Sequence, residues 1–258
     1  MTRIMPMLVL VAAGLVSVGA QAQQPDIDSI ITGACERDSI TRAEIGAMTM
    51  NAESYSRKLG GDGAVKEEKK FLKSYAFKGK LFKEEFREYY LDGKLQDERE
   101  LKKQVAESNE RRRKGRSRDA SINPMEPFYP ENRGKYVFTL TGKELRHGCV
   151  SYHIVADCLV EDENLYEGDF WFEVNWLNLV HAEFHPAKMP TTIKMLDMTK
   201  SYAPVEYGYW LPVGFHLRGK GQAMLFIKFN FEVEERYSGH KIHVGLTDDF
   251  FTEGIIED

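Results

Sequence analysis

Strict alternation of apolar and polar residues through most of the second half of the chain is the feature that most limits its fold. Because successive side chains of a strand point to opposite faces, each alternating run predicts a half-buried strand. Glycines, prolines and acidic clusters separate the runs, which is typical of antiparallel strands joined by short turns. We therefore expect an antiparallel sheet, open or closed. The runs are Tyr136 to Leu140, Val150 to Cys158, Phe170 to Trp176, Val180 to Phe184 and Leu225 to Val233.

Two segments of the first half have the spacing of helices. Residues 26–45 carry apolar side chains three or four positions apart, and an aspartate is available to cap the start. Residues 97–114 have helical spacing with a thin apolar stripe, chiefly Leu101 and Val105. A helix with so narrow an apolar face should pack loosely, so we interpret residues 97–114 as a movable lid and residues 26–45 as a covering helix.

The remaining part of the first half is expected to be extended. Residues 46–59 alternate as a strand does. Residues 64–91 fit either helical or strand spacing, but Gly79 and the pair Asp92-Gly93 are turn signals, and we interpret the segment as two strands. The predicted fold class is α+β, mainly β.

A basic and proline-rich linker is predicted over residues 111–133. Prolines 124, 127 and 130 favour extended chain without ladder hydrogen bonds. The basic run could contact an anionic membrane surface or protein, and the alternative is a frayed helix end and a solvated linker. The basic residues are Arg111, Arg112, Arg113, Lys114, Arg116 and Arg118.

The first 22 residues have the layout of a secretory signal peptide. Arg3 precedes an apolar stretch over residues 4–18, and Ala20-Gln21-Ala22 is a cleavage site of the A-x-A kind. No second long apolar run follows, so residues 23–258 are expected to form one soluble domain in the periplasm. Export argues against nucleic acid as a partner.

Three cysteines in an exported chain leave at least one unpaired. Cys149 and Cys158 fall on one predicted strand and would lie roughly 30 Å apart, too far for a disulfide. If a disulfide forms, Cys35 is therefore one partner; the alternative is that all three are small buried apolar residues.

Four short motifs in the second half, taken in order, resemble those of the LolA/LolB-like superfamily, the periplasmic outer-membrane lipoprotein-sorting proteins and their relatives. The resemblance is best over residues 134–240 and implies an open antiparallel half-barrel with helices covering its concave face, which holds acyl chains. The motifs are Tyr166-Glu167-Gly168-Asp169-Phe170-Trp171-Phe172-Glu173-Val174, Leu179-Val180-His181-Ala182-Glu183-Phe184, Trp210-Leu211-Pro212-Val213 and Glu235-Arg236-Tyr237-Ser238.

Aromatic and aliphatic side chains crowd the second half and are the candidate ligand-binding residues. They could line an apolar concave face that accepts the acyl chains of a lipoprotein or a free lipid, or simply form an ordinary β core. No cofactor is expected. The candidates are Phe170, Phe172, Val174, Trp176, Val180, Phe184, Trp210, Leu225, Ile227, Phe229 and Phe231.

A metal site is the weaker candidate. His181, Glu183 and His185 alternate and so share one face of a strand, where they could ligate a divalent ion or form a solvated polar face. No nucleophile elbow or phosphate-binding loop is present, and we predict no catalytic residues and no metal. The favoured function is a carrier or sensor of acyl chains. The alternatives are an envelope adaptor that uses its sheet edge and basic linker, and a metal-dependent hydrolase.

Overall fold

The computed structural model describes residues 25–79, 81–113, 122–223 and 227–252. Within these ranges the side chains of residues 111–113, 223, 227 and 252 are not described. The predicted signal peptide and three of the six basic linker residues therefore lie outside the described residues. The three are Lys114, Arg116 and Arg118.

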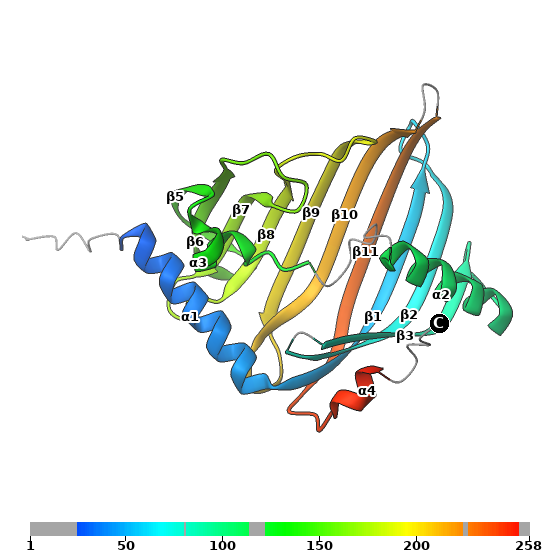
Figure 1. Ribbon diagram of the computed structural model, residues 1–258, viewed down its shortest axis with the longest axis horizontal. Helices are drawn as coiled ribbons and strands as arrows, with labels where there is room; N and C mark the ends of the chain where they lie inside the picture. Colours follow the sequence, from blue (N-terminus) through cyan, green and yellow to red (C-terminus); the bar gives the residue numbers. More distant parts are fainter. Residues whose placement is uncertain (1–24, 80, 114–121, 224–226, 253–258) are drawn as a thin grey trace, which may run out of the picture.

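All strands of the described chain belong to one antiparallel, 11-stranded sheet (Figure 1). Its strand order is β4-β3-β2-β1-β11-β10-β9-β8-β7-β6-β5, and the two end strands do not pair with each other in the described chain, so the sheet is open. The expected open, mainly β fold is therefore confirmed. The strands are β1 Ala47–Leu59, β2 Val65–Lys78, β3 Leu81–Leu91, β4 Lys94–Leu95, β5 Tyr136–Arg146, β6 Cys149–Cys158, β7 Tyr166–Glu173, β8 Leu179–Pro186, β9 Ile193–Pro204, β10 Trp210–Ala223 and β11 Ile227–Ile242.

The sheet consists of two antiparallel meanders that follow each other in the sequence. The chain starts at β1 in the middle and proceeds outward to the edge strand β4. Helix α2 (Glu98–Arg113) then begins a connection that ends at β5, on the opposite edge. From β5 the strands return in order until β11 pairs with β1, so that Met48 lies opposite Ile242. The central seam thus joins the first and last strands of the sequence.

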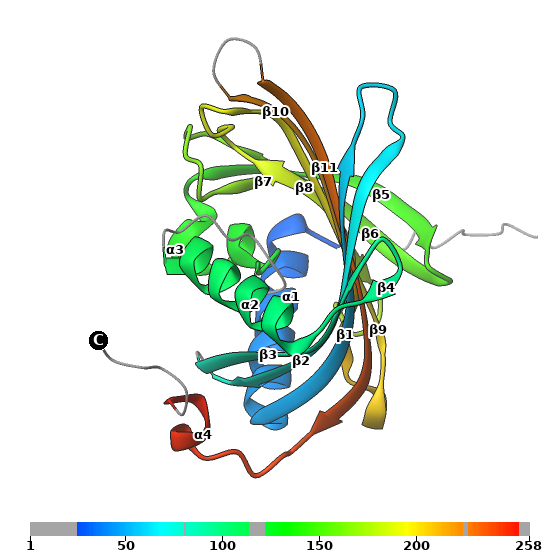
Figure 2. The ribbon, with the colours of Figure 1, turned by 90° about the vertical axis from the view of Figure 1, so that its right-hand side faces the viewer.

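The helices lie on the concave side of the curved sheet, except for α4 (Asp248–Thr252), which lies beside the lower end of β3 (Figure 2). Helix α1 (Ile27–Ile45) runs along the sheet on the side of β5 to β9, and α2 lies across β1 to β3. Both predicted helices are confirmed. Helix α1 buries Ile30, Ile31, Ala34, Thr41 and Ile45, whereas Gln104 is the buried side chain among the described side chains of α2.

The ambiguous segment 64–91 forms a hairpin, as we interpreted it. Phe77 on β2 lies opposite Phe82 on β3, and their ring centroids are 5.2 Å apart. Gly79, at the turn, has φ +57°, a conformation that glycine adopts without steric cost. The two aromatic rings therefore sit at the tip of a long hairpin, next to the site described below.

The second half of the proline-rich segment is not the extended linker that the prolines predicted. Residues 126–128 form a 3-10 turn, η1, and Pro130–Arg133 form the short helix α3. Pro127 is the second residue of η1 and Pro130 is the first residue of α3, positions at which a missing N–H costs no hydrogen bond within the helix. Phe128 between them is fully buried, with its ring 4.9 Å from Phe170 and 5.1 Å from Phe172, edge to face. The segment therefore covers the core beneath β7.

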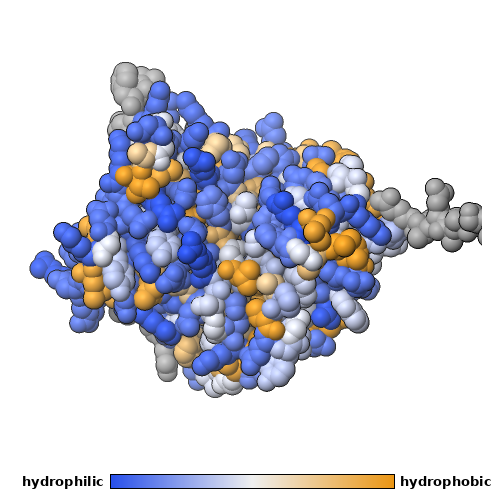
Figure 3. All heavy atoms as spheres, turned by 180° about the vertical axis from the view of Figure 1, so that it is seen from behind, coloured by the Kyte–Doolittle hydropathy of each residue, from blue (hydrophilic) through white to orange (hydrophobic). Residues whose placement is uncertain are grey.

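Most of the core lies between the concave face and this covering layer. The opposite, convex face is mainly hydrophilic, with separate apolar patches (Figure 3). One buried ionic cluster interrupts the core under β2: Lys73, Glu84 and Glu235 are each nearly inaccessible, and Tyr75 and Tyr237 hydrogen-bond to Glu235. Buried charges need such partners, because desolvation otherwise disfavours the ionised forms.

All three cysteines are free. Cys149 and Cys158 occupy opposite ends of β6, as predicted. The Cys35 thiol donates to the carbonyl oxygen of Phe128 at 3.1 Å, which links α1 to the covering turn.

Candidate functional site

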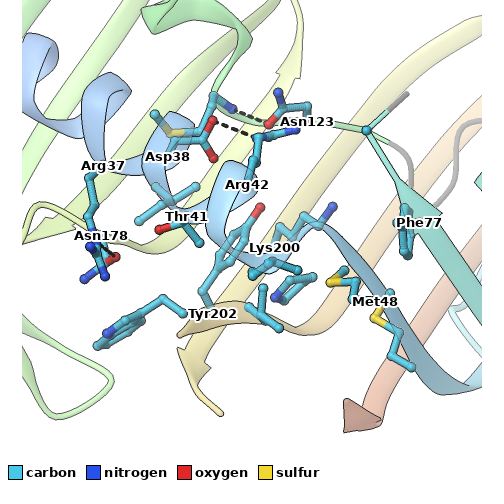
Figure 4. A pocket seen from close by; sticks show the side chains of 18 of the residues that line it. Arg37, Asp38, Thr41, Arg42, Met48, Phe77, Asn123, Asn178, Lys200 and Tyr202 are labelled. Carbon is cyan, nitrogen blue, oxygen red and sulfur yellow. Dashed lines mark hydrogen bonds and ion pairs between the residues drawn. The ribbon is translucent and has the colours of Figure 1, made fainter. Parts of the chain in front are cut away.

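A cavity of about 520 Å³ opens between α1 and the concave face of the sheet. Its walls come from α1, β1, the tip of the β2–β3 hairpin, β9, β10, the turn at 177–179 and the segment at 122–125. Figure 4 shows the side chains around it. Cavities of this size hold small organic ligands in other proteins.

One end of the cavity is apolar. Met48 and Met50 project from β1, and Phe77, Leu81 and Phe82 come from the hairpin tip. Met48 and Met50 are two positions apart on β1, so the same face of that strand presents both of them. Methionine side chains are flexible and polarisable, which lets such a wall adapt to an alkyl chain.

The opposite end is polar and is built mainly by one face of α1. Arg42 Nε lies 2.8 Å from Asp38 Oδ2, and the Tyr129 hydroxyl donates to the same oxygen at 2.7 Å. Arg37 Nε donates to Asn178 Oδ1 at 3.2 Å. Positions 37, 38, 41 and 42 are one turn apart or adjacent, so a single helix face presents them together. In Figure 4 this group lies on the left and Met48 and Phe77 lie on the right.

Strand β9 contributes Lys200 and Tyr202 between the two ends. Lys200 is buried, and its Nζ donates to the carbonyl oxygen of Ile122 at 2.8 Å. Burial raises the pKa of Tyr202, and the negative charge of Asp38 acts in the same direction, so this hydroxyl stays protonated. The floor of the cavity therefore offers a fixed cation and a neutral hydroxyl.

Thr41 is the unusual residue of this site. It is 9% exposed, and its Oγ1 has no hydrogen-bond partner among the described residues. A buried hydroxyl without a partner loses the hydrogen bonds that it makes to water in the unfolded chain. Because Thr41 also lines the cavity, a group inside the cavity is the natural partner for this oxygen.

Among the predicted ligand-binding residues whose side chains are described, Trp210 lines this cavity. Phe170, Phe172 and Phe184 belong instead to the closed core, and Val174 and Phe231 pack partly buried against it. The covering turn fills the space that an acyl chain would need above Phe170 and Phe172. The acyl-chain role of these residues stays a prediction.

The other predicted residues lie elsewhere. Val180 is fully buried on β8, and Trp176, at the turn after β7, is 69% exposed. Phe229 fills the space over Gly221 of the neighbouring strand. Leu225 lies outside the described residues, and Ile227 is described only as backbone. Of the basic run, Arg111, Arg112 and Arg113 end α2 with undescribed side chains.

Sequence reasoning missed the polar end of the cavity. The spacing of Arg37, Asp38, Thr41 and Arg42 on one helix face was the available signal, because an ordinary covering helix would present apolar residues there. Met48 and Met50 were recognised as strand residues but not as a wall of a cavity. They line a cavity only because β9 and β10, about 150 positions later in the sequence, form the neighbouring wall. The sequence near Met48 does not indicate that these strands lie close by.

The histidine cluster on the outer side of β8 is a hydrogen-bonded network. His181 Nε2 lies 3.1 Å from Glu183 Oε1, and its Nδ1 lies 3.0 Å from Ser201 Oγ and 3.2 Å from His147 Nε2. Glu183 also forms an ion pair with Arg146. Burial lowers the pKa of His181 to about 4, and the charge of Arg146 acts in the same direction.

This network differs from the metal site considered above. Among the described residues no group of three or more histidine, cysteine or acidic side chains is placed to hold a metal ion. His185 turns to the carbonyl oxygen of Pro186 rather than to His181. No helix in the described ranges is both long and apolar enough to span a membrane.

Comparisons with known proteins find similarity at the level of solved structures. No protein-family model matches the sequence, and no curated protein matches it either. The fold is similar to that of LolA superfamily proteins. One such protein, from Nitrosomonas europaea, is 13% identical with a TM-score of 0.37, over 89% of this chain and 99% of that one.

Two further structures are similar over most of the chain. An outer membrane lipoprotein-sorting protein domain from Vibrio parahaemolyticus is 14% identical with a TM-score of 0.41, over 86% of this chain and 95% of that one. A DUF1329 family protein from Desulfovibrio piger is 14% identical with a TM-score of 0.43, over 88% and 98%. At such values the likeness concerns overall layout alone, and no ligand or partner follows from it.

Proposed function

We propose that this protein is an exported carrier or sensor that binds an acyl chain of a lipoprotein or a lipid inside its half-barrel. The observation that carries the proposal is the cavity of about 520 Å³ between α1 and the sheet, with an apolar end formed by Met48, Met50, Phe77 and Phe82. The site of action, the periplasm, rests on the signal-peptide pattern of residues 1–22.

Hydrophobic burial is sufficient to hold such a ligand. Each methylene transferred from water contributes about 0.8 kcal/mol, so a dozen methylenes offer on the order of 10 kcal/mol before the cost of ordering the chain. Release then requires a movement of the covering elements or a better acceptor. The covering elements that line the cavity are α1 and the segment at 122–125. Helix α2, with Leu101 and Val105 only partly buried, is more easily displaced, but none of its described residues lines the cavity.

Native mass spectrometry of protein purified from cells without detergent tests the proposal. We expect a retained lipid, or a mass shift equal to an acylated peptide, which organic extraction removes. In the extracted protein, Met48→Glu and Phe77→Glu should each weaken binding of a fluorescent fatty acid by at least about tenfold, because a carboxylate in the apolar end is costly to bury. Trp176→Glu is the matched control, since Trp176 is exposed outside the cavity. A clean apo mass together with no fatty-acid binding would contradict the proposal.

One observation favours the adaptor as a second candidate. Three large apolar side chains are exposed near one end of the sheet: Leu145 at 71%, Val150 at 51% and Trp176 at 69%. Leu145 and Val150 lie opposite each other on β5 and β6. Strand β5 is an edge strand whose outer backbone groups pair with no other strand in the described ranges. A photo-cross-linking residue in place of Leu145 should then capture one envelope protein in cells, whereas the same residue in place of exposed Lys58 should not. The absence of a specific cross-linked product with the residue at position 145 would contradict the adaptor function.

A further inference from the structure

The cavity has two chemically different ends, and the polar end carries a surplus of positive charge. The ionisable residues in its lining are Arg37, Arg42 and Lys200, with Asp38 as the opposing charge. Three cations less one anion leave two positive charges beside the cavity. Of these cations, Lys200 is buried and Arg37 is half-buried, so water screens their charges less than on an open surface, whereas the Arg42 side chain is 57% exposed at the mouth of the cavity.

Donors at this end remain available. Arg37 and Arg42 use Nε for Asn178 and Asp38, and in the described part of the chain their terminal guanidinium nitrogens make no hydrogen bond. The Thr41 hydroxyl, which is buried and has no hydrogen-bond partner among the described residues, lies between them on the same helix face. Two guanidinium groups and one hydroxyl are the donors that bind carboxylate or phosphate oxygens in proteins.

We propose that the cavity takes a single-chain amphiphile with an anionic headgroup, a carboxylate or a phosphate, which Arg37, Arg42 and Thr41 bind while the chain lies against Met48 and Phe77. This inference rests on the proposed acyl-chain function and adds the headgroup to it. An anion satisfies the Thr41 hydroxyl and offsets the surplus charge, whereas a neutral headgroup does only the first. The order of the residues sets the orientation of the ligand, with its head toward α1 and its tail toward the β2–β3 hairpin.

Displacement of a neutral apolar probe, N-phenyl-1-naphthylamine, from the extracted full-length protein separates head from tail. The competitors are dodecanoate, dodecyl phosphate and dodecanol, which share one chain and differ in headgroup. We expect the two anions to displace the probe at concentrations at least about tenfold lower than dodecanol, as one or two charge-assisted hydrogen bonds provide. The more effective of the two anions identifies the headgroup.

Variants locate the effect in the named residues. The double variant Arg37→Gln with Arg42→Gln should bring the anions to within about threefold of dodecanol and leave probe binding unchanged. Thr41→Val, of similar shape, should weaken dodecanoate binding several-fold without lowering the midpoint of thermal unfolding, because the lost hydroxyl makes no hydrogen bond to the part of the chain that the structure describes. Arg218→Gln, an exposed cation on β10 outside the lining, is the matched control and should behave as the unmodified protein.

Each contrary result has a separate meaning. Equal displacement by dodecanol and dodecanoate overturns the anionic headgroup but leaves acyl-chain binding intact. A preference for anions that survives the double arginine variant overturns the assignment to these residues. Calorimetric binding of inorganic phosphate as tight as that of dodecyl phosphate shows a free-anion site and overturns the amphiphile. Failure of both the probe and dodecanol to bind refutes the proposed function itself.

Discussion

Lys73 Nζ on β2 lies 3.1 Å from Glu235 Oε1 on β11, although 162 positions separate the two residues. The same nitrogen is 3.0 Å from Glu84 Oε1 on β3, and both carboxylates are 2% exposed. Burial lowers the pKa of Lys73, but Glu235 and Glu84 outweigh this and raise it, so the lysine is charged at neutral pH. One ammonium group therefore ties together three strands.

Lys73→Met should destabilise the fold strongly, because it removes the cation that two buried carboxylates share. Removal of one partner from a buried ion pair costs about 3–5 kcal/mol. Urea denaturation at pH 7 measures the change in the free energy of unfolding. Lys58→Met is the control: the Lys58 side chain, which pairs with Glu67, is 68% exposed, and an exposed pair contributes about 0–1 kcal/mol. A loss below about 1 kcal/mol for Lys73→Met would contradict this account.

Acid should destabilise the protein through His181. Its pKa is about 4 in the folded state against 6.5 in the unfolded chain, so between these values the unfolded state binds the extra proton. The free energy of unfolding should then fall as the pH drops from 6.5 to 4, on the order of 2–3 kcal/mol from this residue. Chemical denaturation at several pH values should show a shallower fall for His181→Gln than for His185→Gln, whose side chain is 41% exposed. Equal pH profiles would exclude the role of His181.

Gly168 on β7 should not tolerate a side chain. Its φ is +146°, and a Cβ there would overlap the backbone of Glu183 and Phe184 on β8. Gly168→Ala should therefore lower the free energy of unfolding by about 2–3 kcal/mol, through backbone strain and overpacking. Gly61→Ala, in a turn with open space around it, should change stability little. Thermal unfolding of both variants compares them directly, and similar midpoints would show that β7 and β8 can separate at this point.

Helix α2 should exchange its amide hydrogens faster than α1. Five buried residues hold α1 against the sheet, whereas Gln104, bonded to Lys69 Nζ at 2.9 Å, is the buried side chain in the described part of α2. Fewer buried contacts allow local opening at a lower free energy. Hydrogen exchange followed by mass spectrometry gives the two rates. Stronger protection in residues 98–110 than in residues 27–45 would exclude a lid that opens.

The spacing of apolar side chains was enough to predict the strands and the covering helices. Burial on one face gives apolar residues a repeat of two positions in a strand and of three to four in a helix, and this repeat is visible within a short stretch of sequence. The same reasoning placed the ligand site among Phe170, Phe172 and Phe184. In the structure those residues belong to the core, and Phe128, from a segment predicted as linker, packs on Phe170 and Phe172. Their acyl-chain role stays a prediction. The prolines predicted an extended segment and did not indicate the two short helical turns that contain Pro127 and Pro130.

The cavity could not be predicted from local patterns. Its apolar end is made by β1 and the β2–β3 hairpin, and its polar end by α1 with β9. These elements meet because β1 pairs with β11. The local sequence around either strand does not indicate this long-range pairing. The arginines of α1 were visible in the sequence, but their place beside the cavity depends on the segment at 122–125, which the sequence placed in a linker.

The seam between β1 and β11 also constrains the order in which the chain folds. Met48 pairs with Ile242, from which roughly three quarters of the chain separates it, whereas β2 and β3 pair with their sequence neighbours. Closing so long a loop is slow compared with forming hairpins, so the seam belongs to the last steps of folding. A chain that emerges from its N-terminus would hold β1 as an unpaired edge until its final strand arrives. During that interval the free edge of β1 is open to a strand of another chain, so the late formation of the seam is the step at which folding competes with aggregation.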